Sequence, residues 1–164
     1  MRIATRVSAV VAALFSLATA AQAQSANITA LATVFQPISF ASTRNLDFGN
    51  VFPGVAKTVG VAAATSGQFE MAGQASANVN LSFALPTNLT SAGNNLPIGT
   101  WTGCTNATNT TTGCTSFTPS GSATPSAFSG TGALWVFVGA TVTPAAGQAA
   151  GNYTGTVTLT AAYF

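Results

Sequence analysis

The sequence predicts an all-β protein, and three observations lead to this fold class. After residue 23 no segment shows helical periodicity, whereas several segments alternate apolar and polar residues as half-buried strands do. Turn-forming Gly, Pro and Asn residues separate these segments at short intervals. A chain of 164 residues fits one domain with its own hydrophobic core. Together these features predict an immunoglobulin-like antiparallel β-sandwich of about seven to nine strands.

The first 23 residues have the organisation of a secretory signal peptide, expected to form a helix that is later cleaved off. Arg2 and Arg6 precede an apolar stretch over residues 7–20, which ends in Ala21-Gln22-Ala23. This stretch is too short and too interrupted for a membrane span, which needs about 20 apolar residues. Gln24 stands where a lipid anchor would need a cysteine. We therefore expect a bacterial protein that is periplasmic and then extracellular or on the cell surface, without stable membrane insertion.

Residues 24–36 form the first expected element, an alternating N-terminal strand. Over residues 27–36 one face carries modest-sized apolar side chains, and Pro37 then interrupts the ladder. These side chains are Ile28, Ala30, Ala32 and Val34. The pattern allows two interpretations: the segment pairs within its own chain as the first strand of a complete sandwich, or it is donated to a neighbouring chain. The sandwich domain itself is expected over residues 37–164.

Further strands are expected between the turn signals. They cover residues 38–41, 45–48, 57–63, 68–72, 78–85 and 133–143. The last of these is the most apolar, as a strand buried on both faces would be. The clearest strand pattern belongs to residues 152–164, where threonines share one face and apolar residues share the inward face. The inward residues include Tyr153, Val157, Leu159 and Tyr163.

Residues 100–131 depart from the strand pattern, because they are rich in Thr, Ser, Gly, Asn and Pro. We expect a long loop or an irregular strand pair there. Cys104 and Cys114 lie within this region and are expected to form a disulfide in an oxidising compartment. Closing so small a loop contributes about 2–3 kcal/mol. A redox-active pair is the weaker alternative, because such pairs usually have C-x-x-C spacing.

The charged residues and the absence of histidine exclude several function classes. After residue 23 the charges are Arg44, Lys57, Asp47 and Glu70, so the net charge is zero and no nucleic-acid surface is expected. The chain has no His, the commonest general base and metal ligand. Asp47 lies beside the turn at Phe48-Gly49, where a hydrogen bond to backbone amides is the expected role. We therefore predict no catalytic residue, no metal site, no cofactor and no enzymatic activity.

Three segments together resemble a known family. They are the run from Asn45 to Gly54, the run from Pro144 to Gln148, and Gly151-Asn152-Tyr153 at the start of the threonine-alternating strand. In this order, over residues 26–164, they resemble the bacterial secreted family named domain of unknown function 4402. That family is similar in pattern to spore coat protein U-type pilins of the archaic chaperone–usher pathway. The resemblance implies a sandwich completed by a neighbour's strand, with a periplasmic chaperone and an outer-membrane usher as partners.

The expected function is that of a secreted structural subunit of a surface fibre, a homo-oligomer assembled by strand donation. Burial of the donor residues Ile28 and Val34 would then contribute about 1.5–3 kcal/mol each. The alternative is a self-contained, adhesin-like sandwich that binds carbohydrate or another surface through residues 100–131. Aromatic residues such as Trp101 could stack on sugars, although aromatics in strands are more often part of the core.

Overall fold

The structure is a computed structural model that describes residues 24–164. The predicted signal peptide, residues 1–23, lies outside the described residues. The chain divides into two units after Thr33. Residues 24–33 contain no helix or strand, and every described strand belongs to residues 34–164, named here the sandwich domain.

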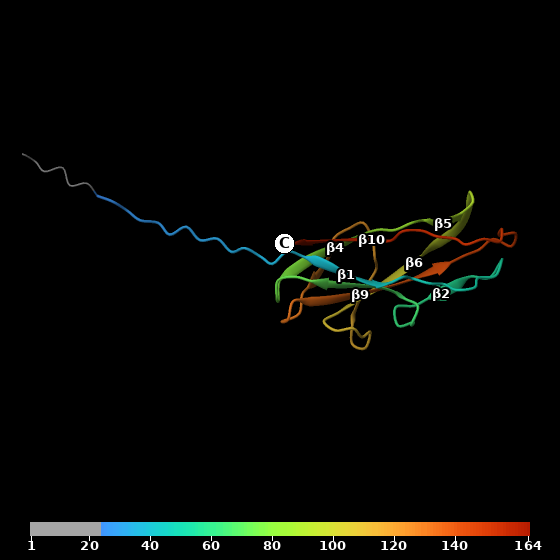
Figure 1. Cartoon of the computed structure of the whole chain (residues 1–164), viewed down its shortest axis with the longest axis horizontal. Coiled ribbons are helices and arrows are strands. Elements are labelled where there is room, and N and C mark those ends of the chain that lie inside the picture. Colours follow the sequence, from blue (N-terminus) through green and yellow to red (C-terminus); the bar gives the residue numbers. More distant parts are fainter. Residues whose placement is uncertain (1–23) are drawn as a thin grey trace, which may run out of the picture. The chain divides into compact units, whose positions relative to one another are not determined.

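The sandwich domain consists of ten strands (Figure 1). Residues 24–164 contain no helix, and so none long and apolar enough to span a bilayer. The fold class is therefore all-β, as predicted. In chain order the strands are β1 (Ser39–Arg44), β2 (Lys57–Val59), β3 (Gly67–Ala72), β4 (Asn78–Ala84), β5 (Asn88–Ser91), β6 (Asn94–Asn106), β7 (Thr115–Phe117), β8 (Thr124–Ala127), β9 (Ala133–Val142) and β10 (Thr158–Tyr163).

The strands form two antiparallel sheets of unequal size. The larger sheet has seven strands in the order β1-β3-β9-β6-β5, with β2 paired to β9 and β7 paired to β6. The smaller sheet has three strands in the order β10-β4-β8. Buried side chains from both sheets meet in one core, so the predicted antiparallel β-sandwich is confirmed, with ten strands rather than seven to nine.

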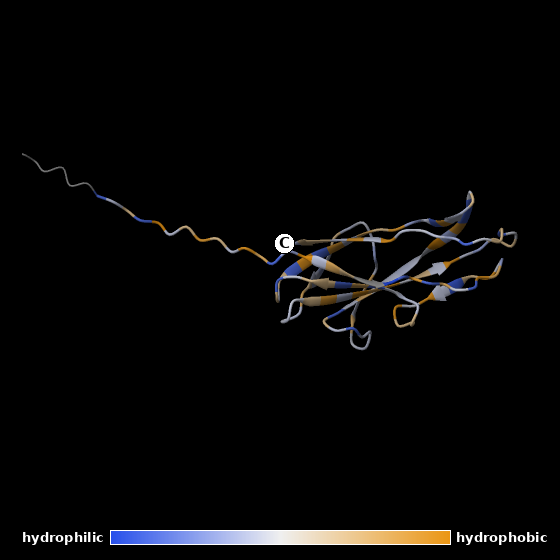
Figure 2. Ribbon diagram, viewed as in Figure 1, coloured by the Kyte–Doolittle hydropathy of each residue, from blue (hydrophilic) through white to orange (hydrophobic). Residues whose placement is uncertain are grey.

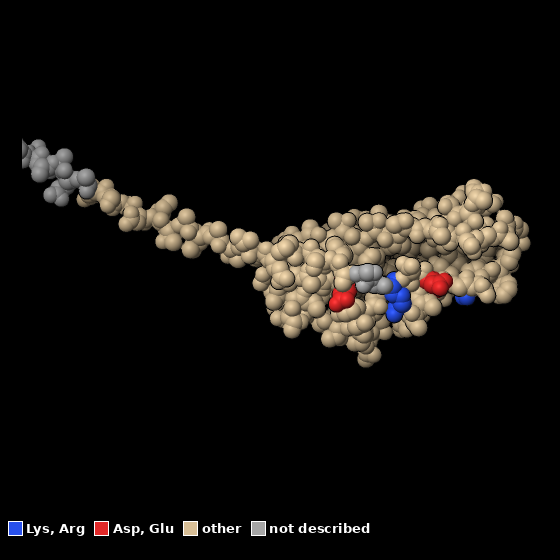
Figure 3. All heavy atoms as spheres, in the orientation of Figure 1, with Lys and Arg blue, Asp and Glu red and all other residues tan. Residues whose placement is uncertain are grey.

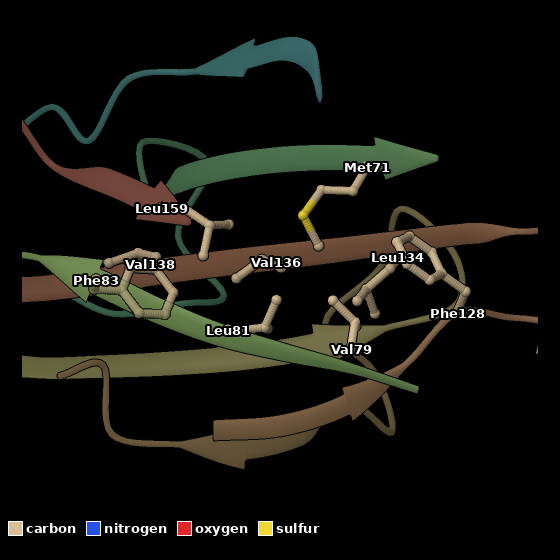
Figure 4. Close-up of a cluster of buried hydrophobic side chains, with 9 residues drawn as sticks. All are labelled: Met71, Val79, Leu81, Phe83, Phe128, Leu134, Val136, Val138 and Leu159. Atoms are coloured by element: carbon tan, nitrogen blue, oxygen red, sulfur yellow. The ribbon is translucent and has the colours of Figure 1, made fainter. Parts of the chain in front are cut away.

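The core between the sheets is made by β3 and β9 on one side and by β4 and β10 on the other. Figure 4 shows their apolar side chains pointing toward one another. Full burial of a Val, Leu or Met side chain contributes about 1.5–3 kcal/mol, which makes this cluster a main source of stability. Its buried members, named core cluster 1, are Met71, Val79, Leu81, Phe83, Phe128, Leu134, Val136, Val138 and Leu159.

Strand β9 lies in the middle of the larger sheet, as its continuous apolar sequence predicts. It pairs with β3 on one edge and with β6 on the other. The inward-facing Leu134, Val136 and Val138 belong to core cluster 1, whereas Phe137 lies on the opposite face and is only 2% exposed. Both faces of β9 are therefore covered, which explains why its sequence does not alternate.

The loop between Cys104 and Cys114 covers this outer face of the larger sheet. The two cysteines form the predicted disulfide. Gln68 and Cys104 flank Phe137 on the neighbouring strands, and the Gln68 side-chain amide donates a hydrogen bond to Asn109 in the loop. The disulfide thus holds a polar loop over an aromatic side chain that the sheet alone would leave in water.

The sequence patterns predicted the bounds of three strands, β3, β4 and β9, to within one residue at each end. Figure 2 shows the hydrophobic and hydrophilic residues interleaved along the ribbons. The N-terminal part of the domain is less regular than predicted. One strand, β1, replaces the two predicted over residues 38–41 and 45–48, and the strand predicted over residues 57–63 ends at Val59. It ends there because Gly60 and Ala63 form a hydrogen-bonded turn.

Of the two arrangements expected over residues 100–131, a long loop or an irregular strand pair, the structure shows strand pairs, because this region contains the end of β6 and all of β7 and β8. Threonine-rich segments form strands readily when a neighbouring edge accepts their backbone. Here β9 pairs with β6 as far as Asn106, and β4 pairs with β8.

The hairpin from β5 to β6 turns at Ala92 and Gly93, which both have positive φ angles, 47° and 83°.

Candidate binding groove

A groove lined by both polar and apolar residues opens beside the smaller sheet, which covers only one half of the larger one. The other half, formed by β5, the start of β6 and the end of β9, faces irregular chain. The groove has a volume of about 970 Å³. Residues 44–53 form its first wall, and residues 148–157 form its second wall.

The floor of the groove is a second apolar cluster of the sandwich domain. Leu96, Ile98 and Val142 line the groove and are at most 8% exposed. Above them, the wall residues Leu46 and Val51 are only half-buried, so they keep apolar surface in water that a bound chain would cover. The buried members, named core cluster 2, are Phe48, Val59, Leu96, Ile98, Ala140 and Val142.

The first wall is fixed by polar contacts of its own residues. The guanidinium of Arg44 donates to the Ser66 carbonyl and to the Ser66 hydroxyl, each at 2.8 Å. The carboxylate of Asp47 accepts a hydrogen bond from the backbone N–H of Gly49 at 2.7 Å. Gly49 has a φ of 57°, a left-handed conformation that favours glycine. Asp47 therefore makes the backbone hydrogen bond that the sequence predicts, and it shapes a turn.

The charged side chains of residues 24–164 gather near this wall. In Figure 3 the blue and red atoms form one short row across the face shown, and the rest of that face is uncharged. Lys57 donates to the Asn50 carbonyl at 2.9 Å, so a third charged side chain holds the first wall. Glu70, the fourth, lies on β3 opposite Ala41 of β1. The floor and the second wall carry no charge among the described residues.

The second wall is fixed by a tyrosine and a glutamine. The Tyr153 hydroxyl donates to the Ala149 carbonyl at 2.8 Å and accepts from the Gln148 side-chain amide at 2.7 Å. One residue further on, Thr154 exchanges two backbone hydrogen bonds with Thr90 of β5, at 2.8 and 3.0 Å. This bridge and the hydrogen bond from the Gln148 side-chain amide to the Asn95 carbonyl of β6, at 3.0 Å, attach the second wall to the larger sheet.

Neither wall belongs to a continuous strand ladder. Residues 45–56 contain no strand, and residues 152–157 contain only the Thr90–Thr154 bridge. The strand predicted over residues 152–164 is therefore shorter than expected, because β10 begins at Thr158. Its partner β4 ends opposite that residue, at Ala84, and Pro86 follows without an N–H for the ladder. The backbone of both walls is thus largely free to pair with an added strand.

The residues predicted on the inward face of the C-terminal segment are buried or half-buried. Leu159 is buried in core cluster 1, and Val157, Ala161 and Tyr163 pack against it. Tyr153 packs against core cluster 2 instead. The alternation therefore continues through the irregular part, so that one segment contributes both to the core and to the wall of the groove.

The predicted donor residues are exposed and are not part of a strand. Residues 24–36 contain no strand, so the strand expected over residues 27–36 is not formed in the single chain, and its donation to a neighbour stays a prediction. Ile28 and Val34 are 95% and 91% exposed, and Ala30 and Ala32 are exposed as well. An alternating segment becomes a strand only where another edge accepts its backbone hydrogen bonds.

Comparison with known families identifies the family to which the sandwich domain belongs. The family model described as Domain of unknown function (DUF4402) matches residues 38–163. This match includes β1 through β10, and therefore both walls and the floor of the groove, while residues 24–36 precede it. A search of curated proteins finds no match.

Proposed function

This chain belongs to the domain of unknown function 4402 family, and from that premise we propose that it is an exported, non-enzymatic subunit of a pilin-like surface fibre. In this proposal, residues 24–36 of one copy occupy the groove of the next copy by β-strand donation. The observation that carries the proposal is the groove, whose two walls have largely unpaired backbone above an apolar floor. A strand added beside residues 152–157 would continue the smaller sheet.

The exposed N-terminal segment has the chemistry that this groove requires. At about 3.3 Å per residue, residues 24–36 are long enough to run along either wall. One face presents Ile28, Ala30, Ala32 and Val34 toward the apolar floor. Burying Ile28 and Val34, which are almost fully exposed in the single chain, stabilises the complex by about 1.5–3 kcal/mol each. Each backbone hydrogen bond to a wall adds about 0.5–1.5 kcal/mol.

An unfilled groove also implies partners during export. Apolar surface and unpaired backbone at a sheet edge invite aggregation. The proposal therefore includes a periplasmic chaperone that covers the groove before assembly and an outer-membrane usher at which subunits are exchanged. The same pair of partners is what a resemblance to spore coat protein U-type pilins would imply.

The alternative function, carbohydrate binding by a self-contained module, has less support. Trp101, the aromatic residue proposed for sugar stacking, packs against both core clusters. Residues 100–131 form strands of the two sheets and a disulfide-bonded loop, so they present less open loop than their composition indicates.

The proposal is tested by substitutions that distinguish the two faces of the N-terminal segment. We expect purified wild-type protein to form multimers in sedimentation velocity and fibres in electron micrographs. The double variant Ile28→Asp, Val34→Asp should be monomeric, because it would place two carboxylates over an apolar floor. Leu31→Asp is the matched control, because Leu31 is 89% exposed and lies on the opposite face; this variant should assemble as wild type does.

A synthetic peptide of residues 24–36 provides the second half of the test. We expect it to bind the monomeric double variant and to raise its unfolding midpoint, because the groove of that variant is unchanged. Equal loss of assembly in the Leu31→Asp variant and in the double variant would contradict strand donation. So would a wild-type protein that stays monomeric and does not bind the peptide.

A further inference from the structure

The exposed large hydrophobic side chains of residues 24–164 gather in three places. Single exposed apolar residues are common on protein surfaces, but groups of them mark contact surfaces. The first group lies in the N-terminal segment and is addressed by the proposed function. The second, named the C-terminal pole, consists of residues around the start of β1 and the end of β10, and the third, named the turn pole, lies at the mouth of the groove. The groups are Ile28, Leu31 and Val34; Phe35, Phe40 and Phe164; and Phe52 and Val55.

At the C-terminal pole the chain that leads to the N-terminal segment is fixed to Tyr163. The Tyr163 hydroxyl donates to the Gln36 carbonyl at 2.7 Å and accepts from the Gln74 backbone N–H at 2.7 Å. The ring of Phe35 meets the Tyr163 ring edge-on, with 5.2 Å between the ring centroids. Phe164 follows directly and is 65% exposed. These contacts hold Gln36 at one end of the sandwich domain.

The turn pole lies at the opposite end of the strands. Sheet register places Tyr163 opposite Val79, at the start of β4, whereas the groove lies beyond the other end of β4. There Phe52 lines the groove and is 68% exposed, and Val55 is 58% exposed. The turn that carries both is joined to the chain after β9 by a hydrogen bond from Gly54 N–H to the Ala145 carbonyl, 3.0 Å.

The lining of the groove extends from Phe52, exposed at the turn pole, to an inner end near core cluster 1. At the inner end its lining residues Phe69 and Val157 pack against core cluster 1, which fills the space between the sheets. The end of the groove that leads away from the core is therefore the side of Phe52. If Val34 occupies the groove, only Phe35 separates it from Gln36, and at about 3.3 Å per residue the two lie within about 7 Å. The C-terminal pole of the donor is then forced against the turn pole of the acceptor.

We propose that these two poles form a second, apolar contact between successive copies of this chain. Phe35, Phe40 and Phe164 of one copy pack against Phe52 and Val55 of the next. The inference rests on the proposed function, because strand donation brings the poles together. The contact joins different surfaces of two identical subunits, so it extends the assembly as a line and does not close a dimer. Its partner is a second copy of the same chain.

A charge-swap experiment tests this contact separately from the groove. Val55→Glu and Phe164→Lys are introduced singly and together into the full chain; neither residue lines the groove. We expect each single variant to weaken subunit association by about tenfold or more, because a lone charge is placed in an apolar contact. The double variant should recover most of this loss, because its opposite charges meet across the junction. Sedimentation velocity and fibre length in micrographs measure the effect.

Binding of a shorter peptide, residues 24–34, which ends before Phe35 and so carries no residue of the C-terminal pole, distinguishes failure of the contact from failure of strand donation. The same substitutions are placed in the monomeric Ile28→Asp, Val34→Asp background, where the peptide should bind with unchanged affinity. Unchanged peptide binding with unchanged assembly of both single variants would overturn the pole contact alone. Weakened single variants without recovery in the double variant would overturn it as well. Absence of peptide binding throughout would overturn strand donation and the contact with it.

Discussion

Replacing Tyr163 by phenylalanine removes one hydroxyl group from the point where the N-terminal segment meets the sandwich domain. The substitution keeps the ring, so the contacts with Phe35 and Phe128, at centroid distances of 5.2 and 5.9 Å, are retained. It removes the hydrogen bond to the Gln36 carbonyl and the one from the Gln74 N–H. The expected loss of stability therefore comes from hydrogen bonding alone.

The magnitude follows from the two bonds and their surroundings. Each net hydrogen bond contributes about 0.5–1.5 kcal/mol, so two contribute about 1–3 kcal/mol. Gln36 is exposed and Gln74 is half-buried, which allows water to replace the lost hydroxyl in part. We therefore expect the free energy of unfolding to fall by about 1–2 kcal/mol, in the lower half of that range. Urea unfolding followed by tryptophan fluorescence measures this change.

Hydrogen exchange shows whether the loss arises at the predicted place. The backbone N–H of Gln74 should exchange faster in the Tyr163→Phe variant, because its acceptor is gone. Tyr153→Phe is the matched control, because the Tyr153 hydroxyl also makes one donated and one accepted hydrogen bond. It should lose similar stability without affecting Gln74. Unchanged stability together with unchanged exchange at Gln74 would refute the anchoring of Gln36 by Tyr163.

Two further predictions concern the disulfide and export. Replacing Cys104 and Cys114 together by serine should lower the free energy of unfolding by about 2–3 kcal/mol, as measured in urea; stability equal to that of wild type would show that the loop covers Phe137 without the bond. Expression of the whole sequence in a bacterium should yield protein in the periplasm or medium whose N-terminus, determined by mass spectrometry, is Gln24; uncleaved protein in the cytosol would contradict the signal peptide.

The sequence was informative where one segment carried its own signal. Strands β3, β4 and β9 have local apolar patterns that match their burial, and Cys104 and Cys114 are close enough in sequence to indicate their bond. Strands β5 to β8 were not located beyond the expectation of a loop or an irregular strand pair over residues 100–131, because their polar, threonine-rich sequences become strands only through pairing with β9, with β4 and, for β5 and β7, with β6. Such pairing depends on tertiary neighbours, which periodicity does not show.

For a similar reason, the groove could not be predicted from the sequence. It exists because the smaller sheet stops at Ala84 and Thr158, and no single segment contains that information. Arg44 and Gln148 fix the two walls through side-chain hydrogen bonds. Only their positions beside turn residues indicated this role in the sequence. The alternating N-terminal segment, in contrast, has a clear sequence pattern, but this pattern alone does not show whether its own chain or a neighbouring chain accepts it.

The central claim is that the N-terminal segment of one copy fills the groove of another. Photo-crosslinking in assembled protein tests it most directly: a diazirine analogue of leucine replaces Val34 in one copy, and a second copy is labelled with nitrogen-15. Mass spectrometry should then find cross-links to labelled peptides that carry residues 44–53 or 148–157, and the same analogue at Leu31 should give few. Cross-links confined to the unlabelled copy, or equal at both positions, would contradict the claim.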